Sequence, residues 1–259
     1  MLEELGQEIV LSSLNHEKIL RALMVPGRKA FDEAEPALSA QLLSKISQCE
    51  SQVLRFASPK AVLRILPVEQ ISPILIGDDI RRLLSGCSEA ALMALTLGAS
   101  LEKCLMREEV TNMQNAYIMD VCASQAVEDA SDAFGARLGR KLRSAGRYLT
   151  NRYSPGYGDY PLSVQKTLLE YLNAARTIGL TLTPTDLMVP RKSITAVMGI
   201  SDQPKPDVYG TCTHCPLITK CFFRELGERC FHTSGMTPLQ GSADSFCPAA
   251  DDAEERNIL

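Results

Sequence analysis

Ten residues near the middle of the chain, Arg152-Tyr-Ser-Pro-Gly-Tyr-Gly-Asp-Tyr-Pro161, favour neither a helix nor a strand. Two prolines fix φ and lack a backbone donor, and two glycines readily adopt positive φ. The composition therefore predicts a defined, turning loop. Whatever the fold, a turn must join two regular elements at this point.

The side chains of this segment suggest a ligand. An arginine presents a fork that matches a carboxylate, and the face of a tyrosine attracts a cation. Glycine also lets a ligand approach the backbone closely. These groups suit an amino-acid-like ligand that carries a positive charge. The alternative, which composition alone favours, is a rigid surface turn with its tyrosines packed on its prolines.

Composition limits the class of protein. With 259 residues, the chain can form one large domain, alone or with a small appendage. Its net charge of −4 gives no reason to expect nucleic acid as a partner. We expect no membrane span, because no apolar run approaches the roughly 20 residues required. The acidic N-terminus is unlike a signal peptide, so we expect a cytoplasmic protein.

Hydrophobic spacing predicts the regular elements before the loop. We expect one or two helices within 2–24 and further helices over 38–56, 77–84, 109–132 and 133–149. The short apolar run 61–66 is bounded by prolines and predicts a strand.

The elements after the loop are better defined. A helix should bury Leu168, Leu169 and Leu172, with Asp159 or Ser163 as its cap. Gly179 should follow it in the left-handed conformation. Residues 193–200 alternate, with Ile194, Ala196, Met198 and Ile200 on one face, which predicts a half-buried strand. Irregularly mixed helices and strands indicate an α+β fold with a mixed or antiparallel sheet.

Nine cysteines fall into two groups. Cys49, Cys87, Cys104 and Cys122 are scattered, and we expect small buried apolar residues. The others form the pattern Cys212-x2-Cys215-x5-Cys221-x8-Cys230, with Cys247 further on. Four thiolates suit zinc or an iron–sulfur cluster, with Cys247 as an alternative to Cys230; disulfides are the weaker alternative. Since Pro204, Pro206 and Gly210 resemble a linker, we predict one domain over 1–203 and a small Cys-rich appendage over 204–259.

A run of cations precedes the loop. Six of them lie within sixteen residues that contain no Asp or Glu: Arg137, Arg140, Lys141, Arg143, Arg147 and Arg152. One interpretation is a solvated helix face. The other is a basic surface beside the loop that meets an acidic partner or a phosphate.

The motif Arg152-x-x-Pro155-Gly156-Tyr157, followed by Pro161 and an amphipathic helix, resembles the S-adenosylmethionine loop of the activation domain of vitamin B12-dependent methionine synthase. The similarity continues through Gly179-Leu-Thr-Leu-Thr-Pro-Thr-Asp186 and Met188-Val-Pro-Arg-Lys-Ser-Ile-Thr-Ala-Val-Met-Gly-Ile200. Upstream it includes Thr96-Leu97-Gly98 and the helical run 115–132. It resembles most the short, free-standing bacterial members of that family. The resemblance implies an activation-domain-like fold and a buried strand over 90–97.

The resemblance also implies a site. Arg152 should bind the carboxylate of S-adenosylmethionine, Ser154, Gly156 and Tyr157 should contribute backbone groups and close packing, and Pro155 should hold the loop. No catalytic side chain is implied, because the cofactors carry the chemistry and the protein supplies binding and alignment.

The implied function is that of a reactivation subunit with little activity alone. Such a subunit supports reductive methylation of cob(II)alamin, which a partner carries: a cobalamin-binding methionine synthase or another corrinoid protein. An electron donor such as flavodoxin or ferredoxin would take part. Because the reaction consumes an electron, the resemblance favours a [4Fe-4S] cluster over zinc in the Cys-rich segment. Two alternatives stay open: the client is a corrinoid methyltransferase of another pathway, or the chain is a non-enzymatic, zinc-stabilised interaction protein.

The sequence departs from the fused synthases at two places. Ala136 stands where the family has a ligand-contacting glutamate, and Gln203–Asp207 replaces a tyrosine-rich segment. Recognition of the ligand's amino or ribose end should therefore differ in this chain.

Overall fold

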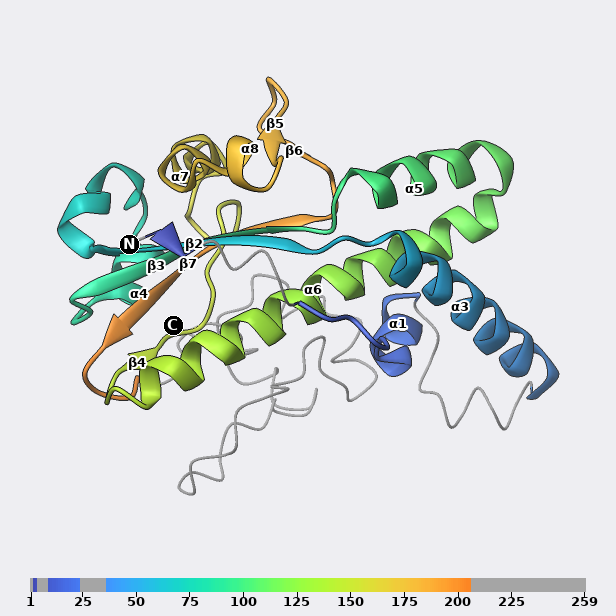
Figure 1. Ribbon diagram of the computed structural model, residues 1–259, viewed down its shortest axis with the longest axis horizontal. Helices are drawn as coiled ribbons and strands as arrows, with labels where there is room; N and C mark the ends of the chain where they lie inside the picture. The colour runs from blue at the N-terminus through green and yellow to red at the C-terminus, as the bar shows by residue number, and fades with distance from the viewer. Residues whose placement is uncertain (1, 4–8, 24–35, 206–259) are drawn as a thin grey trace, which may run out of the picture. The chain divides into compact units, whose positions relative to one another are not determined.

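The computed structural model describes residues 2–3, 9–23 and 36–205 (Figure 1). The chain divides into the units Met1–Lys205 and Pro206–Leu259, and the described residues all belong to the first. In chain order its elements are β1 (Leu2–Glu3), α1 (His16–Ala22), α3 (Pro36–Phe56), β2 (Lys60–Pro67), the 3-10 helix η1 (Val68–Ile74), α4 (Asp78–Leu84), β3 (Glu89–Thr96), α5 (Ala99–Thr111), α6 (Met113–Arg143), β4 (Tyr148–Leu149), α7 (Val164–Leu172), α8 (Ala174–Thr177), β5 (Thr181–Leu182), β6 (Met188–Val189) and β7 (Ser193–Ser201).

A five-stranded sheet organises the fold, with strand order β1-β2-β3-β7-β4. Its pairings are all antiparallel; Met93 of β3, for example, lies between Leu63 of β2 and Ala196 of β7. Strands β5 and β6 form a separate antiparallel pair. The expected α+β class with an antiparallel sheet is confirmed.

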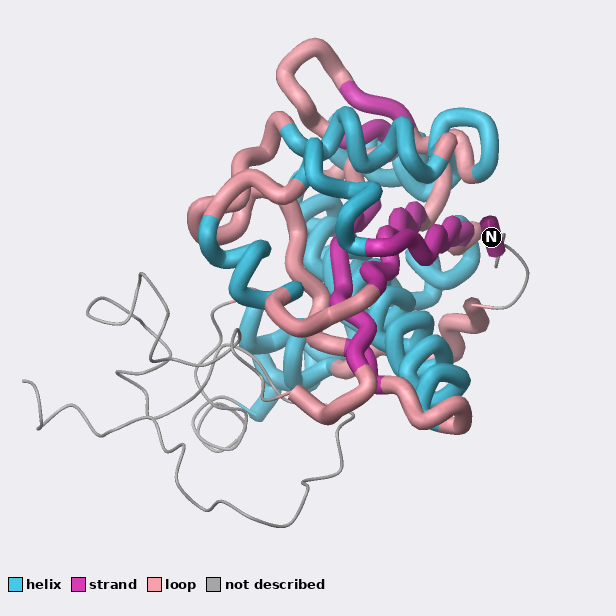
Figure 2. Tube along the Cα trace, turned by 90° about the vertical axis from the view of Figure 1, so that its left-hand side faces the viewer, coloured by secondary structure: helices cyan, strands magenta, loops and turns pink. Residues whose placement is uncertain are grey.

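Helices cover both faces of the sheet. The long α6 contacts β3, β4 and β7 on one face, and α7 contacts β2, β3 and β7 on the other (Figure 1). Figure 2 shows the strands enclosed between helices on either side. The core on the α6 side includes Leu63, Met93 and Met198, whereas Leu92 and Val197, one position along, point to the opposite face and are equally buried.

Because helices cover both faces of the sheet, the expectation that the strand at 193–200 is only half-buried is wrong. The predicted stripe of Ile194, Ala196, Met198 and Ile200 does face the α6 core. Yet Thr195, Val197 and Ser201, on the other face, are buried as well. Thr195 hydrogen-bonds the side-chain oxygen of buried Gln165 in α7 at 3.2 Å, so a polar residue inside the sheet is satisfied there.

The predicted helices 109–132 and 133–149 are wrong in their boundaries. The break falls at Asn112, where the backbone is extended (φ −153°) and the side-chain oxygen accepts from the Asn115 N–H at 3.1 Å, which caps α6. From Met113 to Arg143 the helix is continuous, because it contains no proline. It ends before Gly146, whose φ is +71°, and Tyr148 and Leu149 form a strand instead.

Other expectations fare better. The helices expected at 38–56 and 77–84 and the strands at 61–66 and 90–97 are confirmed within two residues at each end. In the N-terminal region one helix is found within the expected range, α1, but Leu2–Glu3 is a strand on β2, so the expected start of helix at Leu2 is wrong. No helix within the described ranges is long and apolar enough to cross a membrane.

The scattered cysteines confirm their expected role with one exception. Cys49, Cys104 and Cys122 are buried, whereas Cys87 is half-buried. Burial, reinforced by the neighbouring Cys49, raises the pKa of the Cys122 thiol to about 12. That thiol stays neutral at physiological pH and acts as an apolar core group.

Gly139 gives a direct test of the continuous α6. A Cβ at this position would meet no atom within 4 Å, and its φ lies outside the positive range. Gly139→Ala is expected to raise the free energy of unfolding by about 0.5–1 kcal/mol, since alanine restricts the unfolded chain and favours helix. Urea titration followed by circular dichroism measures this change. A lower stability would contradict a helix that runs unbroken through residue 139.

Candidate functional site

The 152–161 loop connects the sheet to α7. Tyr153 fixes its start, because its N–H donates to the Val197 carbonyl and its carbonyl accepts from the Val197 N–H, both at 2.9 Å. The start of the loop is therefore hydrogen-bonded to β7, an interior strand of the sheet that is buried on both faces. Its position is set by the sheet rather than by a mobile linker.

The loop is a defined turn, as expected. The Gly156 N–H donates to the Tyr160 carbonyl at 2.8 Å, and the Tyr160 N–H donates back to the Tyr157 carbonyl at 2.9 Å. Gly156 (φ +94°) and Gly158 (φ +53°) supply the left-handed residues. The turn folds on itself between positions 154 and 160.

Gly158 brings the loop against α4. A Cβ at position 158 would overlap the Asp79 carboxylate and the Tyr153 hydroxyl. The Tyr153 hydroxyl lies 3.0 Å from Asp79 Oδ2 and 3.2 Å from the Tyr157 carbonyl, which it joins by hydrogen bonds. The conformation and the space at this position both require glycine.

Asp159 caps a helix, but α4 rather than α7. Its carboxylate accepts from the backbone N–H of Asp78 at 2.5 Å and of Asp79 at 3.1 Å. Ser163 occupies the cap position of α7 without a side-chain hydrogen bond. The expected cap of α7 is thus corrected: the loop turns Asp159 away from its own helix and towards the positive end of α4. Gly77, at the start of α4, is positioned for this contact, since a Cβ there would lie 2.7 Å from Asp159 Oδ1.

Capping makes loop stability depend on pH. The N–H of Asp78, with that of Asp79, lowers the pKa of the Asp159 carboxyl below its ordinary 3.8. A lowered folded pKa stabilises the fold fully above the unfolded value, and this contribution is lost as the pH falls through the folded value. Asp159→Ala should therefore lower the unfolding temperature at neutral pH, and the difference from wild type should shrink as the pH falls below 3.8.

Thermal unfolding by circular dichroism across this pH range is the measurement. Asp202→Ala removes another exposed carboxylate and serves as the control, which should have little effect at any pH. A pH-independent difference for Asp159→Ala would show that the carboxylate charge plays no part in the cap.

Two tyrosines of the loop stack on each other in the protein interior. Tyr153 and Tyr160 stack with their ring centroids 5.9 Å apart and their planes at 20°. Both are buried, and burial raises the pKa of the Tyr160 hydroxyl above its ordinary range. This stack gives the turn an apolar base.

Arg152 lies at the entrance to the loop and contacts α6. Its Nη2 donates to Asp132 Oδ1 at 2.7 Å and to Glu128 Oε2 at 3.2 Å. The Arg152 side chain is 22% exposed, whereas the Glu128 side chain is 51% exposed. The arginine is therefore oriented by carboxylates one helical turn apart, and the Glu128 contact is the longer and more exposed of the two.

The other predicted loop residues divide into support and surface. Pro155 is buried and Ser154 is half-buried, while Tyr157 is 65% exposed. A Cβ at Gly156 would touch only Leu162, at 3.5 Å, so the backbone there is open. The N–H groups of Gly156 and Tyr157 are used inside the turn. Among the described residues the Pro155 and Gly156 carbonyls accept no hydrogen bond.

The structure adds three residues that the sequence did not single out: Asp79, Glu128 and Asp132. The two α6 carboxylates are four residues apart and hence on one helix face, which is a visible pattern. Their pairing with Arg152 depends on how α6 crosses the sheet, which that pattern does not contain. Asp79 is joined to the loop only through tertiary structure.

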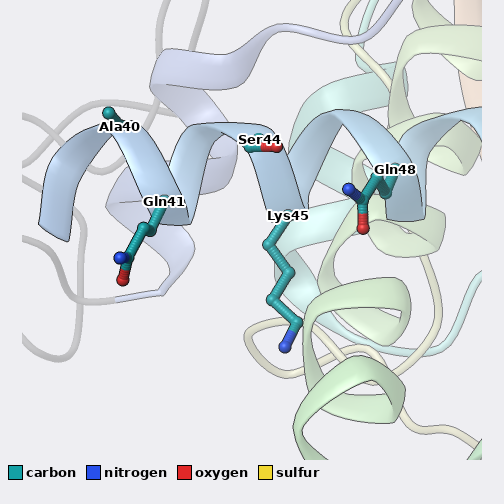
Figure 3. A pocket seen from close by; sticks show the side chains of 5 residues that line it. All are labelled: Ala40, Gln41, Ser44, Lys45 and Gln48. Carbon is teal, nitrogen blue, oxygen red and sulfur yellow. The ribbon is translucent and has the colours of Figure 1, made fainter. Parts of the chain in front are cut away.

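A groove of about 430 Å³ lies elsewhere, on α3 (Figure 3). The described residues that line it all belong to that helix: Ala40, Gln41, Ser44, Lys45 and Gln48. Figure 3 shows Lys45 reaching away from α3, and its Nζ donates to Gln114 Oε1 of α6 at 2.8 Å. This groove includes no residue of the 152–161 loop.

The predicted metal ligands Cys212, Cys215, Cys221 and Cys230, with Cys247, lie outside the described residues. Among the residues that the structure describes, no group of His, Cys, Asp and Glu could hold a metal ion. The metal site and the domain boundary at 203 stay predictions.

Comparison with known proteins gives a likeness of fold. No family model matches the sequence, and no curated protein matches it. Among solved structures, a crystal structure of the MetH reactivation domain bound to AdoHcy is similar to this chain with a TM-score of 0.58. The match covers 82% of this chain and 82% of that chain at 14% sequence identity. At this identity the likeness establishes the fold alone.

Proposed function

We propose that this chain binds S-adenosylmethionine on the 152–161 loop and serves as a reactivation subunit for a cobalamin-dependent methionine synthase. The fold likeness to a reactivation domain bound to AdoHcy supports this proposal. The Arg152-x-x-Pro155-Gly156-Tyr157 motif supports it independently, since it lies on a turn fixed to the sheet.

One observation carries most of the proposal: a half-buried guanidinium stands beside a rigid turn with an open backbone. Nη2 of Arg152 donates to Asp132, which leaves other N–H groups of the guanidinium for a ligand carboxylate. Gly156 leaves room over the turn, and exposed Tyr157 offers a ring face to the sulfonium. Little rearrangement is needed, so little ordering free energy is lost on binding.

The two α6 carboxylates complement the ligand's charge. One guanidinium between two carboxylates leaves a local charge of −1, and S-adenosylmethionine carries a net charge of about +1 at neutral pH from its sulfonium, ammonium and carboxylate groups. The ligand carboxylate would replace Glu128, whose contact with Arg152 is the longer, and the released Glu128 could meet the ligand ammonium. Glu128 would then take the role of the ligand-contacting glutamate of the resembled family, at whose position this chain has Ala136.

The ligand supplies the methyl group, and the corrinoid of the partner supplies the nucleophile that accepts it. This chain's own residues bind and orient: Arg152 positions the amino-acid end, and Pro155 and the Tyr153–Tyr160 stack keep the turn in shape. No side chain of this site has to move a proton. The protein is therefore expected to have little activity without its partner.

Reconstitution tests the proposal. Inactive cob(II)alamin methionine synthase is mixed with a reductant, S-adenosylmethionine and this protein under anaerobic conditions, and methyl-cobalt absorbance is followed. The absorbance should return with wild type and fail to return with Arg152→Ala or without the ligand. Equal return in the absence of this protein would refute the proposed role.

A further inference from the structure

The C-terminal end of α6 carries a concentrated positive surface. We call three of its exposed residues, Arg137, Arg140 and Arg143, the basic surface. Residues 133–149 contain no Asp or Glu, although the whole chain has a net charge of −4. The cations therefore stand out from an acidic protein.

The helix packs in a way that directs these cations to solvent. Its buried side at this end consists of Phe134, Leu138 and Leu142, which follow each other at four-residue spacing. Ala136 precedes the cations and Gly139 lies among them, and both are too small to cover the charged side chains. The basic surface is thus the convex, outward side of the last helical turns.

The basic surface is not explained by pairing within the fold. The neighbouring Arg147 pairs with Glu89, and Arg152 pairs with Asp132 and Glu128. Within the described ranges no ion pair is formed by Arg137, Arg140 or Arg143.

Local helix electrostatics explain only part of it. Arg140, Lys141 and Arg143 lie in the last turn, where cations favour the helix dipole, but Arg137 lies further in. Three spacings, 137–140, 137–141 and 140–143, bring like charges together on the helix, which opposes folding.

We propose that the basic surface docks an acidic patch of a partner protein. Its charge complements such a patch, and electrostatic attraction of this kind speeds encounter and fixes orientation. A small anion would need a concave site, whereas these side chains stand on the convex side of one helix. The overall negative charge opposes a long nucleic acid. The proposal does not depend on ligand binding at Arg152.

The test uses the full chain and fluorescently labelled poly-L-glutamate as the acidic polypeptide. Fluorescence anisotropy gives the dissociation constant over a series of salt concentrations. Arg137→Gln, Arg140→Gln and Arg143→Gln are combined in one variant. The matched control combines Lys103→Gln, Lys166→Gln and Arg176→Gln, which removes three exposed charges from other helices.

Wild type and the control variant should bind the probe with a steep salt dependence, and the α6 variant should bind roughly tenfold more weakly or worse. Equal weakening by both triple variants would overturn the proposal, as would an unchanged α6 variant. Tighter binding of duplex DNA or of phosphatidylglycerol vesicles than of poly-L-glutamate would also overturn it. Thermal unfolding of both variants checks that each remains folded. Both variants should also bind S-adenosylmethionine as wild type does, because the basic surface is separate from the 152–161 loop.

Discussion

Gly158→Ala should destabilise the protein by about 2–5 kcal/mol, the largest stability effect that we expect from one methyl group in the loop. The left-handed conformation (φ +53°) costs alanine about 1–2 kcal/mol. The added Cβ would also overlap the Asp79 carboxylate and the Tyr153 hydroxyl, which hold each other at 3.0 Å. Relieving that overlap means breaking the contact between the loop and α4. Urea titration measures the change in the free energy of unfolding.

Gly146→Ala is the matched control for this effect. Its φ is +71°, yet a Cβ there would meet nothing within 4 Å. It should therefore cost only the backbone term of about 1–2 kcal/mol. If the two variants lose equal stability, the close approach of Gly158 to α4 is not a feature of the folded protein.

Arg152→Ala should reduce affinity for S-adenosylmethionine by roughly a hundredfold or more, because it removes two charge-assisted hydrogen bonds to the ligand carboxylate. The fold should survive, since the pairs with Glu128 and Asp132 are partly exposed and such pairs contribute about 0–1 kcal/mol. Isothermal titration calorimetry measures the affinity, and thermal unfolding measures the fold.

Arg191→Ala controls for the loss of any doubly paired arginine. Arg191 is also held by two carboxylates, and its hydrogen bonds with Glu109 and then Glu102 raise the pKa of its guanidinium. It follows the β5–β6 pair rather than belonging to the 152–161 loop, so its removal should leave the affinity unchanged. Equal loss of affinity in both variants would mean that Arg152 acts through general stability rather than by contact.

Local sequence predicted β2 and β7, whereas β3 was expected only from the family resemblance. Prolines 59 and 67 limit β2 to within one residue, and the stripe from Ile194 to Ile200 marks the face of β7 that meets α6. The burial of the second face could not be predicted. Thr195 and Ser201 are polar in the sequence and become buried only because α7 and the chain beyond β7 supply partners.

The break between α5 and α6 shows why helix boundaries were missed. Both halves have helical composition, so their hydrophobic spacing runs past Asn112 without a visible change. The break is made by one side chain that caps α6 in an extended backbone. Asn is favoured at helix N-caps but is also tolerated inside helices, so Asn112 permits a cap, and the choice depends on the turn that tertiary packing imposes.

The loop was predictable as a turn, and its connections were not. Its glycines and prolines specify the backbone locally, whereas Asp159 caps a helix 81 residues earlier in the chain. Such a contact leaves no local pattern, because any helix start nearby in space could accept the same carboxylate. The pairing of Arg152 with Asp132 is of the same kind.

The proposed function requires that the 152–157 backbone and the Arg152 guanidinium hold S-adenosylmethionine. A crystal structure of the protein grown with that ligand would show whether they do. We expect the ligand carboxylate on Arg152 and the sulfonium beside Tyr157, with Glu128 displaced from the guanidinium. Ligand bound elsewhere, for example in the α3 groove, with Arg152 still held by both carboxylates, would contradict it.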